Sequence, residues 1–249
     1  MAKKSVLITG AGSGIGQATA KLFAENGFTV ILVGRNVDKL KHTEMLVKDN
    51  GGNGFIFPCD LTDLEATKSL VEFALEKVGK IDILINNAGA SSQNRTTLKT
   101  TEFEARNMVD LNLLAPFFLC QYIVPTMLKQ NQGTIINIAS LSGISIGLIG
   151  GPMYSAVKAG LIHFSKYLNA EFVNTGLRVS CIIPGEVDTD AINKRPIKPS
   201  ADSLATMLQP EDLAKTIFTI ATSEDRILFE EVVITPRFRR DMSNEIVSS

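Results

Sequence analysis

The sequence predicts an α/β domain with one parallel sheet of about seven strands and helices on both faces. Short runs rich in Val and Ile alternate along the chain with longer amphipathic segments. The apolar runs lack the polar alternation of a half-exposed strand, so they are expected to be buried on both faces, as in a parallel sheet covered by helices. Strict alternation of strand and helix implies right-handed crossovers and a doubly wound sheet.

The elements follow one another in a regular order. The expected strands are Ser5–Thr9, Phe28–Val33, Phe55–Cys59, Ile81–Asn86, Thr134–Ala139, Arg178–Ile183 and Glu231–Thr235. The expected helices are Gly14–Asn26, Val37–Asp49, Leu64–Val78, Glu102–Gln130, Tyr154–Asn174 and Glu211–Ala221, and Asn-Gly pairs and Asn174-Thr175-Gly176 mark helix ends. No repeat or linker divides residues 1–249, so we expect a single domain. The irregular stretch Asp188–Pro210 is expected to be a substrate lid, because long loops in compact domains are usually functional.

Composition excludes several classes of function. The chain has 249 residues, with 25 Lys and Arg against 26 Asp and Glu, so it lacks the positive charge of a general nucleic-acid binder. Cys59, Cys120 and Cys181 lie far apart and form no disulfide framework or C-x-x-C pair, which predicts buried thiols in a reducing compartment and hence a cytoplasmic protein. With 2 His and no Cys cluster, a metal site is not expected.

One apolar stretch, Leu111–Leu128, could be interpreted as a membrane helix. It contains Asn112, Pro116, Gln121 and Pro125. A helix buried in the core and at a subunit interface is the favoured interpretation, and no membrane is expected. No secretory signal is visible, because the apolar run after Lys4 ends at Thr9-Gly10.

A glycine-rich turn, Thr9–Gly16, joins the first strand to the first helix. A diphosphate can rest on the N–H groups of a helix N-terminus only if the backbone approaches closely, which a Cβ would prevent. The strict G-x-G-x-x-G pattern fails, since Ile15 takes the third glycine position; the spacing present is Gly10, Gly14 and Gly16. The turn predicts a nucleotide site, and a simple tight turn is the alternative.

The end of the second strand distinguishes between cofactors. An acid there would bind the ribose hydroxyl of NAD and repel a 2′-phosphate. This chain instead has Arg35, which could form paired hydrogen bonds with a 2′-phosphate, assisted by the Ser13 hydroxyl. An ordinary surface arginine is the alternative. Asp60, after the third strand, could accept a hydrogen bond from the adenine amino group or be a turn or helix-capping aspartate.

Residues suited to proton transfer lie in the second half of the chain. Asn86-Asn87-Ala88-Gly89 closes the fourth strand, where small residues admit a flat ring and Asn side chains can tie strands together, and Ser140 ends the fifth strand. Tyr154 and Lys158 are four residues apart on a predicted helix and share one face. An adjacent ammonium would lower the pKa of the phenol and make it a usable acid or base.

Together these motifs resemble the short-chain dehydrogenase/reductase family over nearly the whole chain. The resemblance includes Thr9–Gly16, Asn86–Gly89, Asn112, Ser140, Tyr154-x-x-x-Lys158 and Pro184-Gly185-Glu186-Val187-Asp188-Thr189, in this order. It implies a single Rossmann-type domain that is a homodimer or homotetramer and acts on a small carbonyl or alcohol substrate. The basic residue at Arg35 resembles members that prefer NADP (NADPH) over NAD.

The resemblance also implies roles for individual residues. Tyr154 would be the general acid or base, Lys158 would lower its pKa and bind the nicotinamide ribose, Ser140 would bind the substrate oxygen, and Asn112 would hold a water that relays protons to Lys158. The cofactor would contact Gly10, Ser13, Gly14, Ile15, Gly16, Arg35, Asp60, Leu61, Asn87, Ala88, Gly89, Tyr154, Lys158, Pro184, Gly185, Val187 and Thr189.

Two departures from the family pattern leave details open. The spacing from Ser140 to Tyr154 is one residue longer than is common, so Ser142 is a second candidate for the substrate-binding serine. The last strand lacks the glycine pair that many members carry after it, which leaves the subgroup and substrate unassigned.

The sequence leaves more than one interpretation open for the substrate and for the class of function. Apolar residues before Tyr154 (Ile144, Ile146, Leu148, Ile149 and Met153) and lid cations (Lys194, Arg195 and Lys198) would line the substrate site. The cations suggest an acidic substrate, or simply a solvated basic lid. A 3-oxoacyl thioester reductase and a non-catalytic NADP-binding sensor or scaffold are the alternative functions. His163, on the far side of the helix from Tyr154, is expected at an interface or the surface.

Overall fold

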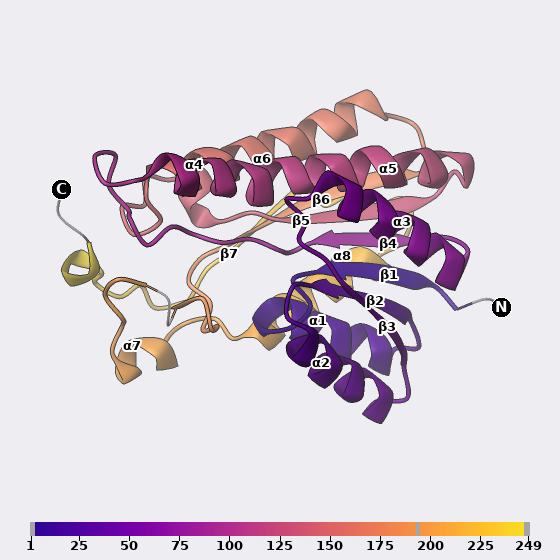
Figure 1. Cartoon of the computed structure of the whole chain (residues 1–249), viewed down its shortest axis with the longest axis horizontal. Helices are drawn as coiled ribbons and strands as arrows, with labels where there is room; N and C mark the ends of the chain where they lie inside the picture. The colour runs from indigo at the N-terminus through magenta and orange to yellow at the C-terminus, as the bar shows by residue number, and fades with distance from the viewer. Residues whose placement is uncertain (1–2, 193–194, 247–249) are drawn as a thin grey trace.

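A computed structural model describes residues 3–192 and 195–246 and shows one seven-stranded sheet (Figure 1). Its strands are β1 (Ser5–Thr9), β2 (Thr29–Gly34), β3 (Asn53–Pro58), β4 (Ile83–Asn86), β5 (Gly133–Ile138), β6 (Leu177–Pro184) and β7 (Glu231–Ile234). All neighbours pair in parallel, in the order β3-β2-β1-β4-β5-β6-β7. The predicted doubly wound parallel sheet is therefore confirmed.

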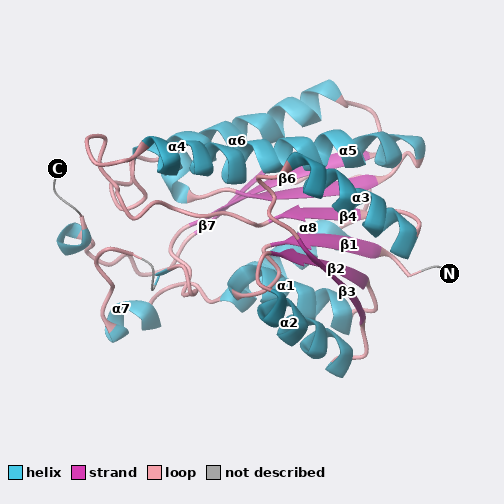
Figure 2. Cartoon of the chain, in the orientation of Figure 1, coloured by secondary structure: helices cyan, strands magenta, loops and turns pink. Residues whose placement is uncertain are grey.

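Helices cover both faces of the sheet (Figure 2). They are α1 (Gly14–Glu25), α2 (Val37–Asp49), α3 (Leu64–Val78), α4 (Glu102–Val109), α5 (Ala115–Lys129), α6 (Pro152–Glu171), α7 (Ala201–Ala205) and α8 (Pro210–Thr222). Helices α1, α2 and α8 pack on one face, and α3, α5 and α6 on the other. Helix α6 ends before the Asn174-Thr175-Gly176 signal, which instead forms a turn with Asn174 at φ 60°.

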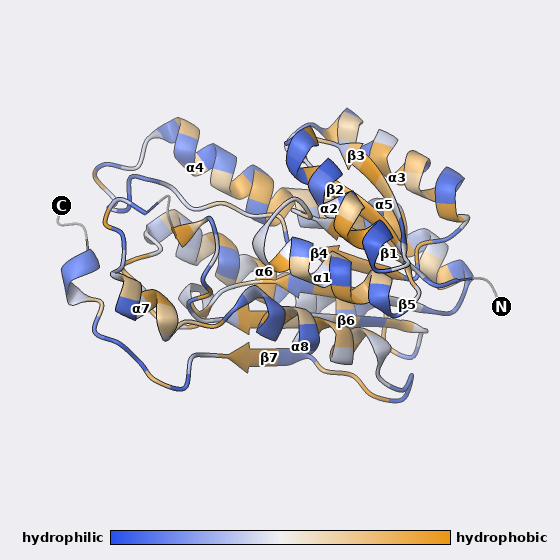
Figure 3. Cartoon of the chain, turned by 90° about the horizontal axis from the view of Figure 1, so that it is seen from below, coloured by the Kyte–Doolittle hydropathy of each residue, from blue (hydrophilic) through white to orange (hydrophobic). Residues whose placement is uncertain are grey.

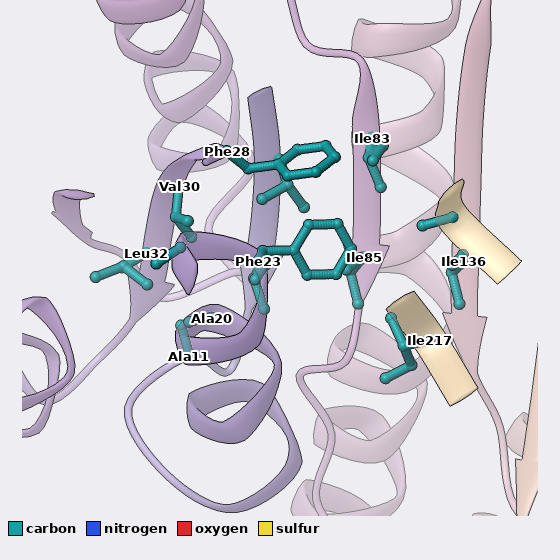
Figure 4. Close-up of a cluster of buried hydrophobic side chains, with 14 of the residues drawn as sticks. Ala11, Ala20, Phe23, Phe28, Val30, Leu32, Ile83, Ile85, Ile136 and Ile217 are labelled. Carbon is teal, nitrogen blue, oxygen red and sulfur yellow. The ribbon is translucent and has the colours of Figure 1, made fainter. Parts of the chain in front are cut away.

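The core divides into two layers because successive strand residues point to opposite faces. Val6 and Ile8 of β1 lie in the cluster formed with α1 and α8, whereas Leu7 lies in the cluster formed with α3 and α5. In the first cluster, Phe23 meets the edge of Phe28 at a centroid distance of 5.0 Å (Figure 4). Apolar residues are concentrated along the strands, and the helices carry polar residues between apolar ones (Figure 3).

The long apolar segment is one continuous helical rod, Glu102–Lys129, built from α4, a π-helical turn (Asp110–Leu114) and α5. Its length and composition would allow it to cross a membrane, but half of its most apolar window is buried within this fold. The π turn has a local cause: Pro116 has no N–H to donate to the carbonyl of Asn112, and its ring crowds that carbonyl. Asn112 is the buried residue of this turn and is 1% exposed.

Several smaller predictions can be compared with the structure. The three cysteines are free and buried, as expected, and His163 is exposed on α6. Among the residues described, no group of three or more His, Cys, Asp or Glu is arranged to hold a metal ion. Phe117 and Tyr167 expose apolar surface on α5 and α6, and the oligomer expected there stays a prediction.

The irregular stretch after β6 lies beyond the carboxyl ends of the strands, beside the C-terminal segment (Figures 1 and 3). It contains α7, and it is tied to the end of β6 by a bridge between Val187 and Leu208. Lys194, one of the predicted lid cations, falls outside the residues described. The role of Asp188–Pro210 as a lid stays a prediction.

Candidate active site

A cleft of about 750 Å3 opens at the carboxyl ends of the strands, next to the point where strand order reverses between β1 and β4. Ligands of open α/β sheets bind at such a switch point. Many of the predicted cofactor residues line this cleft: Gly10, Ser13, Gly14, Ile15, Asn87, Ala88, Gly89, Tyr154, Lys158, Pro184, Gly185, Val187 and Thr189. Gly16, Arg35, Asp60, Leu61 and Asn112 are not part of its lining.

The glycine-rich turn forms a backbone cradle at one end of the cleft. Gly10 and Gly14 have φ of 67° and 52°, which L side chains rarely adopt. A Cβ on Gly16 would overlap the carbonyl oxygen of Gly10 and lie 2.7 Å from Asn87 Nδ2. Ser13 precedes α1 without capping it by a side-chain hydrogen bond. The backbone at the start of α1 therefore lines this end of the cleft, which fits a dinucleotide diphosphate.

Replacing Gly16 by Ala is expected to destabilise the protein by about 1–3 kcal/mol and to weaken dinucleotide binding, because the new methyl group can fit only if β1 and α1 separate. Unfolding by urea and fluorescence titration with NADH and NADPH would measure the two effects. Gly160→Ala on α6 is the matched control, since its Cβ would meet only the flexible side chain of Leu113, at 3.3 Å. Equal behaviour of the two variants would contradict this description of the cradle.

Side-chain hydrogen bonds tie the ends of the central strands together, as the Asn residues after β4 led us to expect. Asn86 Nδ2 donates to Asn137 Oδ1 at 2.9 Å across β4 and β5. The N–H groups of Asn87 and Ala88 both donate to Thr9 Oγ1 at 2.9 Å. Thr9, at the end of β1, was not singled out from the sequence. These bonds fix the backbone between the cradle and the residues suited to proton transfer.

Tyr154 and Ser140 meet at the other end of the cleft. Tyr154 is on the first turn of α6, which Gly151 (φ 80°) and Pro152 begin. The side chain of Ser140, just after β5, lies close enough to the Tyr154 phenol to lower its pKa, and it also accepts from the Ser142 N–H at 3.2 Å. Ser142 lines the cleft too, but the effect of Ser140 on the phenol favours Ser140.

Lys158 lies behind the phenol ring and is 3% exposed. Its Nζ donates to the Ile138 carbonyl at 2.9 Å and is 5.7 Å from the centroid of the Tyr154 ring. Burial lowers the pKa of Lys158 to about 8. The site thus holds an amine that can be charged or neutral at moderately alkaline pH.

Burial raises the pKa of the Tyr154 phenol, and the groups that oppose the increase are the Ser140 side chain and the charges of Arg95 and Arg195. Arg95 was missed by sequence reasoning, and it is the first cation that acts on Tyr154. The predicted lowering of the Tyr154 pKa by Lys158 stays a prediction.

Asn112 lies close to Lys158, as the sequence predicted. A Cβ on Gly89 would be 2.8 Å from Asn112 Oδ1 and 3.3 Å from Lys158 Nζ, so both side chains border the same glycine. Asn112 Nδ2 donates to the carbonyls of Ala90 and Met108, each at 3.0 Å, and its Oδ1 accepts from the Ala90 N–H at 3.3 Å. These bonds hold the segment after β4 against the π turn. The predicted water relay stays a prediction.

Arg35 and Asp60 lie together beyond the ends of β2 and β3. Arg35 Nη1 is 3.9 Å from Asp60 Oδ2, and the two side chains are 69% and 48% exposed, so the pair is weak and Arg35 can turn toward another anion. Asp60 Oδ1 accepts from the N–H and the hydroxyl of Thr62, which makes it a turn aspartate. The helix cap is Asp63, not Asp60. The side chain of Leu61 is buried in the core.

The predicted substrate-lining residues are only partly in place. Ile146, Leu148 and Ile149 line the cleft, whereas Ile144 and Met153 do not. Arg195 lines it but is not a free lid cation: its Nη1 lies 2.7 Å from Glu186 and 3.3 Å from Glu245. Arg240 binds the same two glutamates. We call Glu186, Arg195, Arg240 and Glu245 the arginine–glutamate cluster, and sequence reasoning missed it because the pairs join distant segments.

The chain is similar to proteins of one family throughout its length. Residues 4–199 match the model of the family described as short chain dehydrogenase. An uncharacterised oxidoreductase of Staphylococcus aureus is 36% identical over 234 residues, covering 94% of this chain and 97% of the relative. The 3-oxoacyl-[acyl-carrier-protein] reductase FabG of Thermotoga maritima is 34% identical over 238 residues, covering 92% and 95%. A crystal structure of a metagenomic short-chain oxidoreductase in complex with NADP superimposes with a TM-score of 0.82 at 29% identity, covering 94% of this chain and 98% of that one. The protein therefore belongs to the short-chain dehydrogenase/reductase family and is an oxidoreductase.

Proposed function

We propose that the protein is an NADP(H)-dependent oxidoreductase that interconverts a carbonyl and a secondary alcohol, with Tyr154 as the general acid and base. The observation that carries this proposal is the meeting of Ser140 and Tyr154 in the same cleft as the glycine cradle, with Lys158 buried behind the phenol. A nucleotide held in the cradle would extend toward this end of the cleft.

Each side chain then has a chemical task. When bound, NADP(H) supplies or accepts the hydride. Tyr154 gives its proton to the substrate oxygen as the alcohol forms and takes it back in oxidation. Ser140 donates a hydrogen bond that holds this oxygen near the phenol. The Ile138 carbonyl holds the amine of Lys158 in the lining of the cleft, and Asn112 holds the backbone of Ala90 by a hydrogen bond.

The test is loss of NADPH absorbance, with NADH in parallel, against 2- and 3-oxo acids, their esters, diketones, cyclic ketones and a 3-oxoacyl thioester. Turnover of any of these carbonyls with NADPH supports the proposal. Tight NADPH binding without turnover of any of them would favour the sensor or scaffold instead.

We propose that the protein prefers NADP over NAD, because Arg35 can bind the 2′-phosphate. The similar structure that contains NADP supports it, as does the absence of an acid between residues 33 and 36. Arg35→Glu is expected to lower kcat/KM for NADPH by about 10- to 100-fold, because it removes a charge-assisted hydrogen bond to the 2′-phosphate. The value for NADH should change little. Arg106→Gln, which removes an exposed arginine on α4, is the control. Equal losses with both cofactors would contradict the role of Arg35.

A 3-oxoacyl thioester reductase is the second candidate, favoured by the similarity to the FabG of Thermotoga maritima. The comparison of acetoacetyl-coenzyme A with short oxo acids decides between the two. A kcat/KM that is highest for the thioester would identify this second activity, and a preference for small oxo compounds would exclude it.

A further inference from the structure

Arg95 is a buried cation in the wall of the substrate end of the cleft. It belongs to the segment between β4 and α4 and is 8% exposed. A Cβ on Gly151, three residues before Tyr154, would lie 3.1 Å from its Cα. Its guanidinium lies close enough to the Tyr154 phenol for the ionisation of each group to affect the other. Arg95 is therefore near the reacting centre.

No carboxylate in the described part of the chain neutralises this charge. The ionisable groups that act on Arg95 are Arg195, whose charge repels it, and Tyr154, which is neutral while its phenol is protonated. The described acids that line the cleft are engaged elsewhere: Glu186 binds two arginines, Asp190 lies 2.7 Å from Lys39, and Asp241 accepts from the Ser243 N–H and hydroxyl. A buried charge is costly unless it is paired, so this position calls for an anion from outside the chain.

The guanidinium is held in place and still has donors to offer. Its Nε donates to the Ser92 carbonyl at 3.0 Å, Nη1 donates to the Ile149 carbonyl, and Nη2 donates to Ser91 Oγ at 3.3 Å. These bonds leave one N–H on each Nη without a partner among the residues described. Two neighbouring N–H donors on a fixed planar group match the two oxygens of a carboxylate.

The nearby arginines cannot take this role. Arg195 and Arg240 share Glu186 and Glu245, so the arginine–glutamate cluster is close to neutral. Lys198, the remaining described lid cation, is exposed and does not line the cleft. Arg95 is thus the uncompensated guanidinium that the described residues place beside Tyr154.

We propose that Arg95 binds the carboxylate of the substrate, so that the substrates are short oxo acids and the corresponding hydroxy acids. The inference rests on the proposed function, because it places the carbonyl at Tyr154 and Ser140 and the carboxylate at Arg95. A carboxylate is favoured over a phosphate because one uncompensated positive charge and two free N–H groups balance a monoanion. The sequence suggested an acidic substrate from lid cations, whereas the structure moves that recognition to the segment after β4.

The test compares each acid with its methyl ester, which keeps the carbonyl but lacks the charge. Pyruvate, acetoacetate and levulinate and their methyl esters are reduced with NADPH by the wild-type protein, by Arg95→Met and by Arg95→Lys. The wild type should prefer the acid at one of these chain lengths. Arg95→Met should lower the ratio of kcat/KM for acid to ester by roughly 30-fold or more, since it leaves the carboxylate in a buried site without its partner. Arg95→Lys should recover part of the ratio.

Lys198→Met is the matched control, because it removes one positive charge from the lid without touching the cleft. Its acid-to-ester ratio should equal that of the wild type. An unchanged ratio in Arg95→Met, or equal loss of acid and ester, would overturn the inference and show that Arg95 only braces the loops at Ser92 and Ile149. Wild-type reduction of esters in preference to acids would also overturn it and leave the proposed function intact, whereas no turnover of any carbonyl overturns the proposed function itself.

A second measurement does not depend on folding of the Arg95 variants. Butyrate, which has no keto group to reduce, should inhibit ester reduction by the wild type competitively, and butyramide at the same concentration should not. Equal inhibition by the two compounds, or none by either, would contradict a carboxylate site.

Discussion

Replacing Tyr154 by Phe is expected to lower kcat for carbonyl reduction by about 10²- to 10⁴-fold, the usual contribution of a positioned general acid. The substitution removes one hydroxyl group and keeps the ring that packs over Lys158. Binding of NADPH should persist, because the cradle is formed by backbone at the far end of the cleft. Stopped-flow or steady-state loss of NADPH absorbance gives kcat, and fluorescence titration gives the affinity.

Tyr167→Phe is the control for this experiment, since Tyr167 is on the same helix but 59% exposed. It should leave kcat unchanged. If Tyr154→Phe kept most of the wild-type kcat, another group would have to supply the proton, and the assignment of Tyr154 would be wrong.

Tyr154 also determines how the rates of reduction and oxidation should change with pH. Burial raises the pKa of the Tyr154 phenol, so the phenol remains protonated through neutral pH and is ready to donate. Reduction should therefore be steady across neutral pH, while oxidation, which needs the phenolate, should rise as the solution becomes alkaline. A fall in the oxidation rate between neutral and alkaline pH would contradict this role.

Most of the fold could be predicted from the sequence because its signals are local. Uninterrupted Val and Ile runs such as Val6–Ile8 identify buried strands, and the glycines at positions 10, 14 and 16 identify a turn that admits no Cβ. The meeting of Ser140 with Tyr154 followed from their places after β5 and at the start of α6. Boundaries differed by a few residues where tertiary packing decided them, as at the end of α6.

The rest of the site depends on contacts between distant segments, for which the sequence carries no local signal. Arg95 is in an irregular segment with no periodicity, and its partners include Ile149, on a loop far along the chain. Arg195 carries an obvious charge, but its neutralisation depends on Glu245, contributed by the C-terminal segment. The position of the Lys158 amine depends on the Ile138 carbonyl, which accepts its hydrogen bond at 2.9 Å.

The segment after β7, which lacks the glycine pair, carries two charged residues that form ion pairs with other segments. The segment that follows this strand carries Arg240 and Glu245, which bind Glu186 after β6 and Arg195 in the predicted lid. Three segments that border the cleft are thereby joined by charges that are largely shielded from water, where ion pairs are less screened than at the surface. The segment after β7 therefore contributes charged residues to the substrate end of the site.

Replacing Lys158 by Met is expected to abolish most of the activity and, at neutral pH, to remove an electrostatic cost from the folded state. The lowering of the Lys158 pKa from 10.5 to about 8 corresponds to roughly 3 kcal/mol of destabilisation in the charged form. The loss of the hydrogen bond to the Ile138 carbonyl opposes the gain by about 1–3 kcal/mol, so the net change at one pH can be small. Such a residue is kept for function at the expense of stability.

The pH dependence of the unfolding free energy separates the effect of the Lys158 charge from the effect of its lost hydrogen bond. Between the folded and unfolded pKa values, from about 8 to 10.5, the unfolded chain binds more protons at Lys158, so the stability of the wild type rises with pH. The unfolding free energy of the wild type should therefore increase relative to Lys158→Met by about 3 kcal/mol over this range and stay parallel to it below pH 8. Urea unfolding without added nucleotide at several pH values measures the difference. Lys166→Met on the same helix is the control, because Glu231 raises the pKa of Lys166 above 10.5 and its curve should stay nearly parallel to that of the wild type over this range. If the Lys158 curves stayed parallel up to pH 10.5, the amine would not be desolvated in the folded protein, and its assigned place behind the phenol would be wrong.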